Sequence, residues 1–211
     1  HIAGDETMCN AFISGMDIHT ATAAQVFGVA PADVTSLQRR NAKAVNFGIV
    51  YGIGAFSLAK DIGVTRKEAD DYIKGYLRHY AGVDKYMETV AKEAKEKGYV
   101  STLWERRRYL PELNSSNGML RAFGERVARN MPIQGTAADI IKIVMVKIDE
   151  LLKNYDSKLV LTIHDELIFK LNVNEEDELV PAIKDIMENT IKMSVKLEVD
   201  GGVADNWYDI K

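Results

Sequence analysis

Residues 39–52 are RRNAKAVNFGIVYG, and this stretch decides how the rest of the chain is interpreted. Arg39, Lys43, Phe47 and Tyr51 are spaced four apart, so on an α-helix they form one slowly drifting row. A buried face would exclude the two cations, and a solvated face would not carry the two rings. The row fits a ligand with a polyanionic end for the cations and a flat end for the rings. The alternative is an amphipathic helix whose basic side chains extend into solvent.

Around this row the sequence predicts an α+β chain, rich in helix, with a small antiparallel sheet late in the chain. Capping residues and glycines bound most of the helices, and Pro132 should kink or end a helix. Apolar runs on both sides of residues 164–166 predict a β-hairpin. The expected helices cover 18–27, 36–50, 55–62, 66–80, 83–97, 119–130, 135–152 and 175–193, and the expected strands cover 99–103, 108–110, 158–163, 167–173 and 196–199.

The composition indicates that the chain can bury a hydrophobic core, since 46% of its 211 residues are hydrophobic and 27% are charged. One cysteine excludes a disulfide framework, and no secretory signal opens the chain, so we expect a soluble, cytoplasmic protein. The net charge of −4 conceals a basic middle, because residues 36–134 contain 18 basic and 11 acidic side chains. A basic middle between acidic flanks is typical of a polyanion groove. Solvated helix faces are the alternative.

The tip of the predicted late hairpin, His164-Asp165-Glu166, places two carboxylates side by side. Like charges about 4 Å apart repel by ~4 kcal/mol at an effective dielectric of 20, and a divalent cation would remove that penalty. Mg²⁺ prefers one or two carboxylates together with phosphate oxygens. We expect Asp165 to be the main ligand and Glu166 a weaker or indirect one, because neighbours in a strand point to opposite sides. An exposed polar turn is the alternative.

A second basic stretch offers groups for nucleic acid. Arg106-Arg107-Arg108 forms a cationic turn beside a predicted strand, and Arg126, Asn130 and Gln134 continue a four-residue spacing. Arg, Asn and Gln side chains reach minor-groove acceptors and sugar oxygens. Spacing alone does not distinguish this row from a helix with ordinary polar residues.

Residues 39–52 resemble the fingers-helix motif of family A DNA polymerases, the bacterial DNA polymerase I family. In that family the helix binds the incoming deoxynucleoside triphosphate. The resemblance implies that Arg39 and Lys43 hold the triphosphate, Phe47 faces the sugar and base, and Tyr51 guards the templating base pair. It also implies that Lys43 acts in catalysis by giving a proton to the leaving pyrophosphate.

Three further segments extend the resemblance over nearly the whole chain. Asp17-Ile18-His19 is similar to the helix that supplies a triphosphate-contacting histidine, here His19. Residues 162–166 resemble the palm motif with His-Asp-Glu on a hairpin, which implies that Asp165 and Glu166 bind metal and that His164 contacts DNA. Residues 126–139 resemble the stretch that contacts the primer–template near the growing end.

The chain departs from the family pattern at Glu105, where the family usually has Gly before the arginine run. We expect the negative charge to weaken the local grip on template phosphates. The family's other palm motif, with the Asp that holds both metals, should lie before His1. The opening residues His1-Ile2-Ala3-Gly4-Asp5-Glu6 look like the tail that follows it, and Asp5 and Glu6 are not part of its pattern.

The resemblance implies a DNA-directed DNA polymerase of replication and repair, present as a C-terminal fragment. Residues 1–130 would form the fingers with the template-contacting basic segment, and residues 131–211 part of the palm. The cofactor would be Mg²⁺, two ions in the complete enzyme. The partners would be a DNA primer–template, deoxynucleoside triphosphates and an upstream palm and thumb polypeptide, with no membrane. Without that polypeptide we expect the chain to be inactive.

Two other classes of protein remain open. A noncatalytic nucleic-acid-binding module would share the basic middle, but it needs neither Asp165 nor the Phe47 and Tyr51 rings. A metal-dependent nuclease using Asp165 and Glu166 is less well supported, because no other carboxylate or histidine cluster has ligand spacing.

Overall fold

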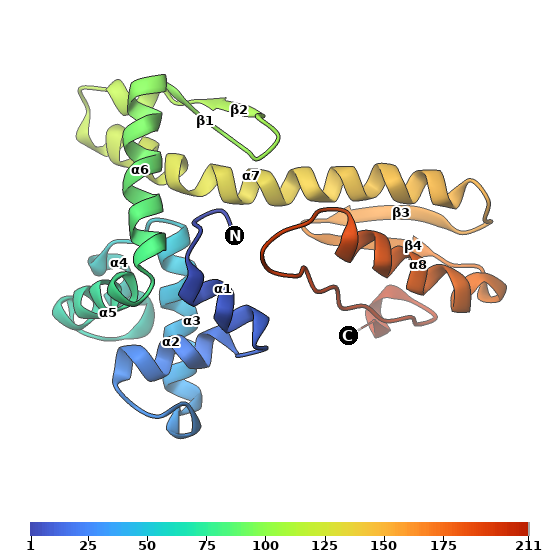
Figure 1. Cartoon of the computed structure of the whole chain (residues 1–211), viewed down its shortest axis with the longest axis horizontal. Coiled ribbons are helices and arrows are strands. Elements are labelled where there is room, and N and C mark those ends of the chain that lie inside the picture. The colour runs from blue at the N-terminus through green and yellow to red at the C-terminus, as the bar shows by residue number, and fades with distance from the viewer. Residues whose placement is uncertain (211) are drawn as a thin grey trace. The chain divides into compact units, whose positions relative to one another are not determined.

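A computed structural model describes residues 1–210 and divides the chain into two compact units, His1–Thr136 and Ala137–Lys211 (Figure 1). The helices of the first unit are α1 (Glu6–Ile13), α2 (Ile18–Phe27), α3 (Ser36–Val50), α4 (Ala55–Ile62), α5 (Arg66–His79), α6 (Ala81–Lys97) and the first part of α7 (Gly118–Leu152). Its strands are β1 (Tyr99–Ser101) and β2 (Arg107–Tyr109). The second unit adds β3 (Lys158–Ile163), β4 (Glu166–Lys170) and α8 (Glu176–Asn189). The short 3-10 turns are η1 (Pro31–Asp33), η2 (Pro111–Asn114), η3 (Val173–Glu175) and η4 (Trp207–Asp209).

The expected α+β class is confirmed, with two separate two-stranded antiparallel sheets, β1–β2 and β3–β4. The division into a fingers part ending at residue 130 and a palm part after it stays a prediction. None of the helices within residues 1–210 has the length and apolar character needed to cross a bilayer.

Capping explains why α2 and α3 begin and end where the sequence predicts. The Asp17 side chain accepts a hydrogen bond from the His19 amide at the start of α2, and Gly28 closes that helix with φ 65°. Thr35 and Gln38 form a reciprocal capping box at the start of α3. These caps satisfy backbone groups that the helix itself leaves unpaired, and so they fix where α2 begins and ends and where α3 begins.

The core of the first unit fixes the buried side of α3. Val45 is 1% exposed and Ile49 7% exposed, and both belong to one cluster with Leu58, Tyr76 and Tyr80. With that side of α3 turned inward, the opposite side of the helix is left for solvent or ligand.

The hairpin β1–β2 turns at residues 102–106. Thr102 organises the turn, because its hydroxyl accepts hydrogen bonds from the amides of Trp104 and Arg106, both at 3.3 Å. Glu105 has φ 60°, a left-handed conformation that favours glycine. The turn therefore keeps a glycine-like backbone although Glu stands in that position.

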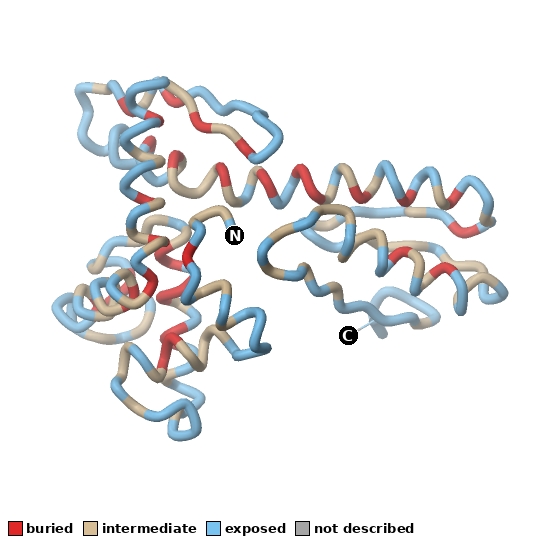
Figure 2. The backbone as a smooth tube through the Cα atoms, viewed as in Figure 1, coloured by how far each residue is buried: buried red, intermediate tan, exposed pale blue. Residues whose placement is uncertain are grey.

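Helix α7 corrects one expectation, because it continues through Pro132 where we expected a kink or an end. Buried positions recur along the helix about once per turn (Figure 2), among them Ala128, Pro132 and Thr136. Proline removes one intrahelical hydrogen bond, but each part of α7 buries an apolar side in its own unit. That packing outweighs the lost bond.

In the second unit, β3 and β4 pair antiparallel, with Ile163 opposite Glu166 and an irregularity between Leu159 and Leu161. Glu166 is therefore the first residue of β4, and the turn itself consists of His164 and Asp165. One apolar side of α7 and the buried residues of α8 form the core under this sheet, including Val144, Ile148, Leu179 and Ile183.

Two expectations for the C-terminal segment were wrong. The last helix ends at Asn189 and not near residue 193, and residues 196–199 form no strand. Lys196 pairs with Glu188 at 2.7 Å, and the Val199 amide donates to the same carboxylate at 3.2 Å. Contacts with Glu188 of α8 therefore hold this segment, which we expected to be a strand.

Candidate active site

The row on α3 stands on the exposed side of the helix. The side chain of Arg39 is 49% exposed, and Phe47 and Tyr51 are 49% and 51% exposed. The Lys43 ammonium lies 5.8 Å from the centroid of the Phe47 ring. Exposure alone does not mark a ligand site, since Phe56 is 72% exposed elsewhere in the chain, but here two rings follow two cations on one side of one helix. We call Arg39, Lys43, Phe47 and Tyr51, together with His19, the nucleotide face, after the role that the sequence resemblance predicts for them.

His19 comes to this face from α2, as expected for a residue that acts with the row. Its ring centroid lies 5.8 Å from that of Phe47, and its Nδ1 lies 2.8 Å from Asn46 Nδ2. With Asn46 as donor, the neutral ring carries its proton on Nε2, which can then donate to an anion. Burial lowers the pKa of His19, with Arg39 and Lys43 adding to that direction and Asp17 opposing it.

Sequence reasoning missed two residues of this site. Asp17 has no expected role of its own, yet besides capping α2 its Oδ2 lies 2.5 Å from Arg39 Nε and accepts from the Thr20 hydroxyl at 2.6 Å. Asn46 is only 9% exposed and supports His19. A polar residue on the buried side of α3, next to Phe47, was the signal that could have pointed to Asn46.

The hairpin β1–β2 brings the arginine run beside α7. Arg106 Nη2 donates to the Gly135 carbonyl at 2.8 Å, and the Leu103 amide donates to the Thr136 hydroxyl at 3.2 Å. The Arg107 guanidinium lies 4.6 Å from the centre of the Tyr99 ring. Arg107 and Arg108 are exposed. The structure thus places this cationic turn next to the C-terminal end of the α7 row, which consists of Arg126, Asn130 and Gln134.

The α7 row also reaches the end of α3. Asn130 Nδ2 donates to the Val50 carbonyl at 3.3 Å. A Cβ atom added to Gly52 would lie 2.8 Å from Arg126 Cγ, so the two residues are in close contact. Gln134 is exposed. Two members of the predicted DNA row therefore adjoin one end of the nucleotide face.

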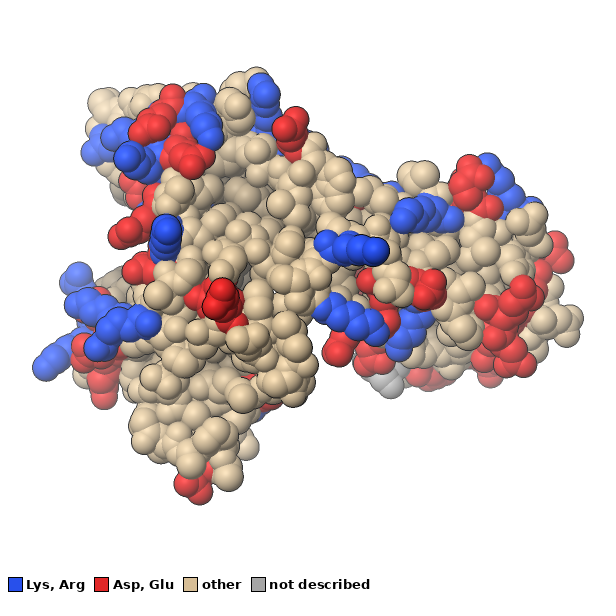
Figure 3. All heavy atoms as spheres, viewed as in Figure 1, with Lys and Arg blue, Asp and Glu red and all other residues tan. Residues whose placement is uncertain are grey.

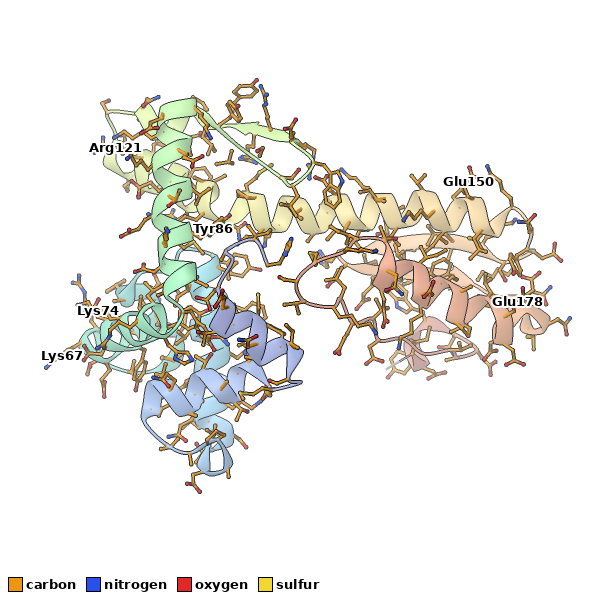
Figure 4. All side chains as sticks on the ribbon, viewed as in Figure 1. Lys67, Lys74, Tyr86, Arg121, Glu150 and Glu178 are labelled. Carbon is orange, nitrogen blue, oxygen red and sulfur yellow. The ribbon has the colours of Figure 1, made fainter. Side chains whose placement is uncertain are left out.

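Part of the positive charge of the middle segment lies on ordinary solvated helix faces. Lys67 and Lys74 project outward from α5 (Figure 4), and Lys74 pairs with Asp70 at 2.6 Å. On the molecular face drawn in Figure 3, charges of both signs are mixed around α5 and α6. The candidate polyanion surface therefore consists of the arginines of the β1–β2 turn and of α7. The net positive charge of residues 36–134 does not by itself indicate such a surface.

The tip of hairpin β3–β4 is exposed at His164, Asp165 and Glu166. His164 has φ 54°, a conformation that is costly for a residue other than glycine and that often marks functional turns. Across residues 1–210, no three His, Cys, Asp or Glu side chains gather to hold a metal ion. The two carboxylates fit a magnesium ion that takes further oxygens from a bound phosphate or from water, and they do not form a closed metal site.

Asp5 has a structural role, in line with its exclusion from the expected metal ligands. It is 5% exposed and caps α1 by accepting from the Met8 amide at 2.7 Å. Its other oxygen accepts from the Gly82 amide at 2.8 Å, which ties α1 to the start of α6.

The first unit thus presents a helix with cations followed by aromatic rings and a histidine held against it, and the second unit presents an acidic hairpin tip. The family model for DNA polymerase family A matches residues 1–209, and the chain belongs to that family. The chain is 49% identical over 214 residues to DNA polymerase I of Lactococcus lactis subsp. lactis (strain IL1403), and 50% identical over 213 residues to DNA polymerase I of Bacillus subtilis (strain 168). Each comparison covers 100% of this chain and 24% of the relative, so the chain spans about a quarter of the length of these relatives.

A solved structure of similar fold is the POL domain of Pol1 from M. smegmatis in complex with DNA primer-template and dNTP. The TM-score is 0.89 at 39% sequence identity, and the match covers 94% of this chain and 35% of that chain.

Proposed function

We propose that this chain is part of a DNA-directed DNA polymerase and supplies its nucleotide-binding face and some of its metal-binding carboxylates. The observation that carries the proposal is the nucleotide face itself. Arg39, Lys43 and Phe47 share the exposed side of α3, and His19 reaches Phe47 from α2. Relatives named DNA polymerase I, and a neighbour solved with primer-template and dNTP, support the proposal.

In the proposed reaction, the primer 3′-hydroxyl attacks the α-phosphate of a deoxynucleoside triphosphate. A bond forms between the 3′ oxygen and the α-phosphorus, the hydroxyl proton passes to solvent, the bond from the α-phosphorus to the oxygen bridging to the β-phosphorus breaks, and pyrophosphate leaves. Arg39, Lys43 and the His19 Nε2–H would bind the triphosphate, and Lys43 would give a proton to pyrophosphate. Phe47 would stack on sugar and base, and Tyr51 would stand at the templating pair.

Asp165 and Glu166 would hold Mg²⁺ as part of a two-ion site. When bound, the metal lowers the pKa of the attacking hydroxyl and neutralises charge that develops on the phosphates. The remaining ligands would come from an upstream polypeptide, so we propose that the isolated chain is inactive. Residues 1–130 would act as fingers and residues 131–211 as part of the palm, in a cytoplasmic enzyme of replication and repair.

We propose that the first unit binds the primer–template through the polar side chains of the β1–β2 turn and of α7, and that the second unit offers His164 for DNA contact. Arginine and amide side chains can position a duplex by its phosphates, sugars and minor-groove acceptors. The proposed DNA-contacting residues are Arg106, Arg107, Arg126, Asn130, Gln134 and His164.

Calorimetric titration of the chain with a deoxynucleoside triphosphate tests the proposal. Arg39→Ala and Lys43→Ala should each weaken binding by about tenfold or more, the scale of a charge-assisted hydrogen bond. Arg40→Ala is the matched control, because it removes the same charge from the adjacent position of α3, outside the row. Equal losses in all three variants would reveal nonspecific attraction. No binding by the unaltered chain would favour a noncatalytic nucleic-acid-binding module.

A further inference from the structure

The end of α3 sets where Tyr51 stands. Tyr51 is 51% exposed, so packing does little to fix its ring, and its place depends on the backbone that carries it. Helix α3 ends in a Schellman motif, in which the Gly52 amide donates to the Ile49 carbonyl at 2.9 Å and the Ile53 amide to the Gly48 carbonyl at 2.7 Å. Gly52 has φ +70°, as that motif requires.

This motif leaves the Val50 carbonyl to a donor from outside the helix end. Asn130 is that donor, reaching Val50 from 80 residues along the chain with an Nδ2–O distance of 3.3 Å. Asn130 is half-buried. Its amide keeps a second N–H and its carbonyl oxygen for another partner. It can therefore hold Val50 and bind a ligand at the same time.

Arg126, one turn earlier on α7, contacts Gly52, the residue that follows Tyr51. A Cβ atom on Gly52 would lie 2.8 Å from Arg126 Cγ and 3.4 Å from Arg126 Cβ, so the alkyl stem of the arginine lies against the Gly52 backbone. Arg126 as a whole is exposed. The two α7 side chains therefore contact the residues immediately before and after Tyr51.

We propose that Asn130 and Arg126 are positioning residues that hold the backbone at Val50 and Gly52 and so fix Tyr51. Because the same two side chains belong to the proposed DNA row, DNA bound to α7 would be coupled to the nucleotide face through this contact. Coupling of this kind is reciprocal, so nucleotide would strengthen DNA binding by the factor by which DNA strengthens nucleotide binding. The nucleotide part of this inference rests on the proposed function, whereas the positioning of Tyr51 does not.

The test is made without DNA, where a residue that only contacts DNA has no effect. We would measure amide hydrogen exchange at Gly52 and Ile53, and the affinity for a deoxynucleoside triphosphate, in the 211-residue chain. Asn130→Leu should speed exchange at both amides by about five- to tenfold, the scale of one lost hydrogen bond. It should also weaken nucleotide binding several-fold. Gln134→Leu alters the next, exposed member of the row and is the control, with exchange at Gly52 and Ile53 expected to stay unchanged.

A second pair of variants separates the arginine stem from its charge. Arg126→Met keeps an unbranched stem over Gly52 and should leave exchange at Gly52 unchanged, whereas Arg126→Ser should speed it. Unaltered exchange in both Asn130→Leu and Arg126→Ser would overturn the proposal. If the unaltered chain binds no nucleotide, the proposed function fails, and the exchange data still decide whether α7 positions Tyr51.

Discussion

Asp17 and Arg39 form an ion pair between the start of α2 and the first turns of α3, with Asp17 Oδ2 2.5 Å from Arg39 Nε. The hydrogen bond from Arg39 holds the pKa of Asp17 well below its usual range, and the pKa of Arg39 is raised in turn. Both side chains are more than a third exposed, so the pair adds little to stability. Its effect is orientation, because it engages Nε and leaves the terminal nitrogens of the guanidinium to face an anion.

Asp17→Ala should therefore weaken binding of a deoxynucleoside triphosphate several-fold, because Arg39 loses its orienting partner. Asp17→Asn should recover most of the affinity, since Asn keeps an acceptor oxygen and caps a helix as well as Asp does. Calorimetric titration of both variants makes the comparison. Tighter binding by Asp17→Ala would show instead that the carboxylate competes with the phosphates for Arg39.

The His19 imidazole should make stability depend on pH. Burial lowers its pKa below the ordinary value of 6.5, so the unfolded chain binds more protons than the folded chain as pH falls through that value. Stability contributed by neutral His19 is thus present above about pH 6.5 and is lost as pH falls toward the folded pKa. Urea unfolding at pH 7.5 and pH 5.5 should show a smaller loss in His19→Gln than in the unaltered chain. Equal losses would contradict this.

Local signals in the sequence were sufficient for several helices of the first unit, although they did not predict α1. The expected bounds 18–27 and 36–50 are those of α2 and α3, and the caps at Asp17 and Thr35 and the left-handed Gly28 account for them. The four-residue spacing also predicted the nucleotide face, because helix periodicity alone places Arg39 and Phe47 on one side.

Contacts between residues far apart in the chain could not be predicted in this way. Asn130 meets Val50 across 80 residues, and Arg39 meets Asp17 across 22, and no local pattern encodes either contact. At Pro132 a local signal was present but gave the wrong result. Proline predicts a kink or a helix end, whereas packing on both sides of Pro132 keeps α7 continuous. Tertiary contacts therefore decided what propensity had left open.

Glu105 should be replaceable by glycine with a gain in stability. Its φ of 60° is strained for a residue with a side chain, and glycine removes that strain. We expect Glu105→Gly to raise the free energy of unfolding by about 1 kcal/mol, measured by urea denaturation. It should also tighten binding to duplex DNA at low salt, because a negative charge beside Arg106 is lost.

Glu105→Ala separates these two effects. Alanine removes the charge but keeps a Cβ at the same φ, so DNA binding should improve while stability gains little. If Ala and Gly stabilise the chain equally, charge repulsion is the cause and backbone strain is not.

The tip of hairpin β3–β4 should bind a divalent cation through Asp165 more than through Glu166. The two carboxylates have different backbone positions, since Asp165 lies in the turn and Glu166 is the first residue of β4, paired with Ile163. Paramagnetic Mn²⁺, used in place of Mg²⁺, should broaden the amide signals of residues 164–166 in the unaltered chain. Asp165→Asn should weaken this effect by about tenfold, because one of two attracting charges and a ligand oxygen are changed, and Glu166→Gln should weaken it less. Asp149→Asn, an exposed carboxylate on α7, is the matched control. Equal broadening in Asp165→Asn and Asp149→Asn would remove Asp165 from the metal site.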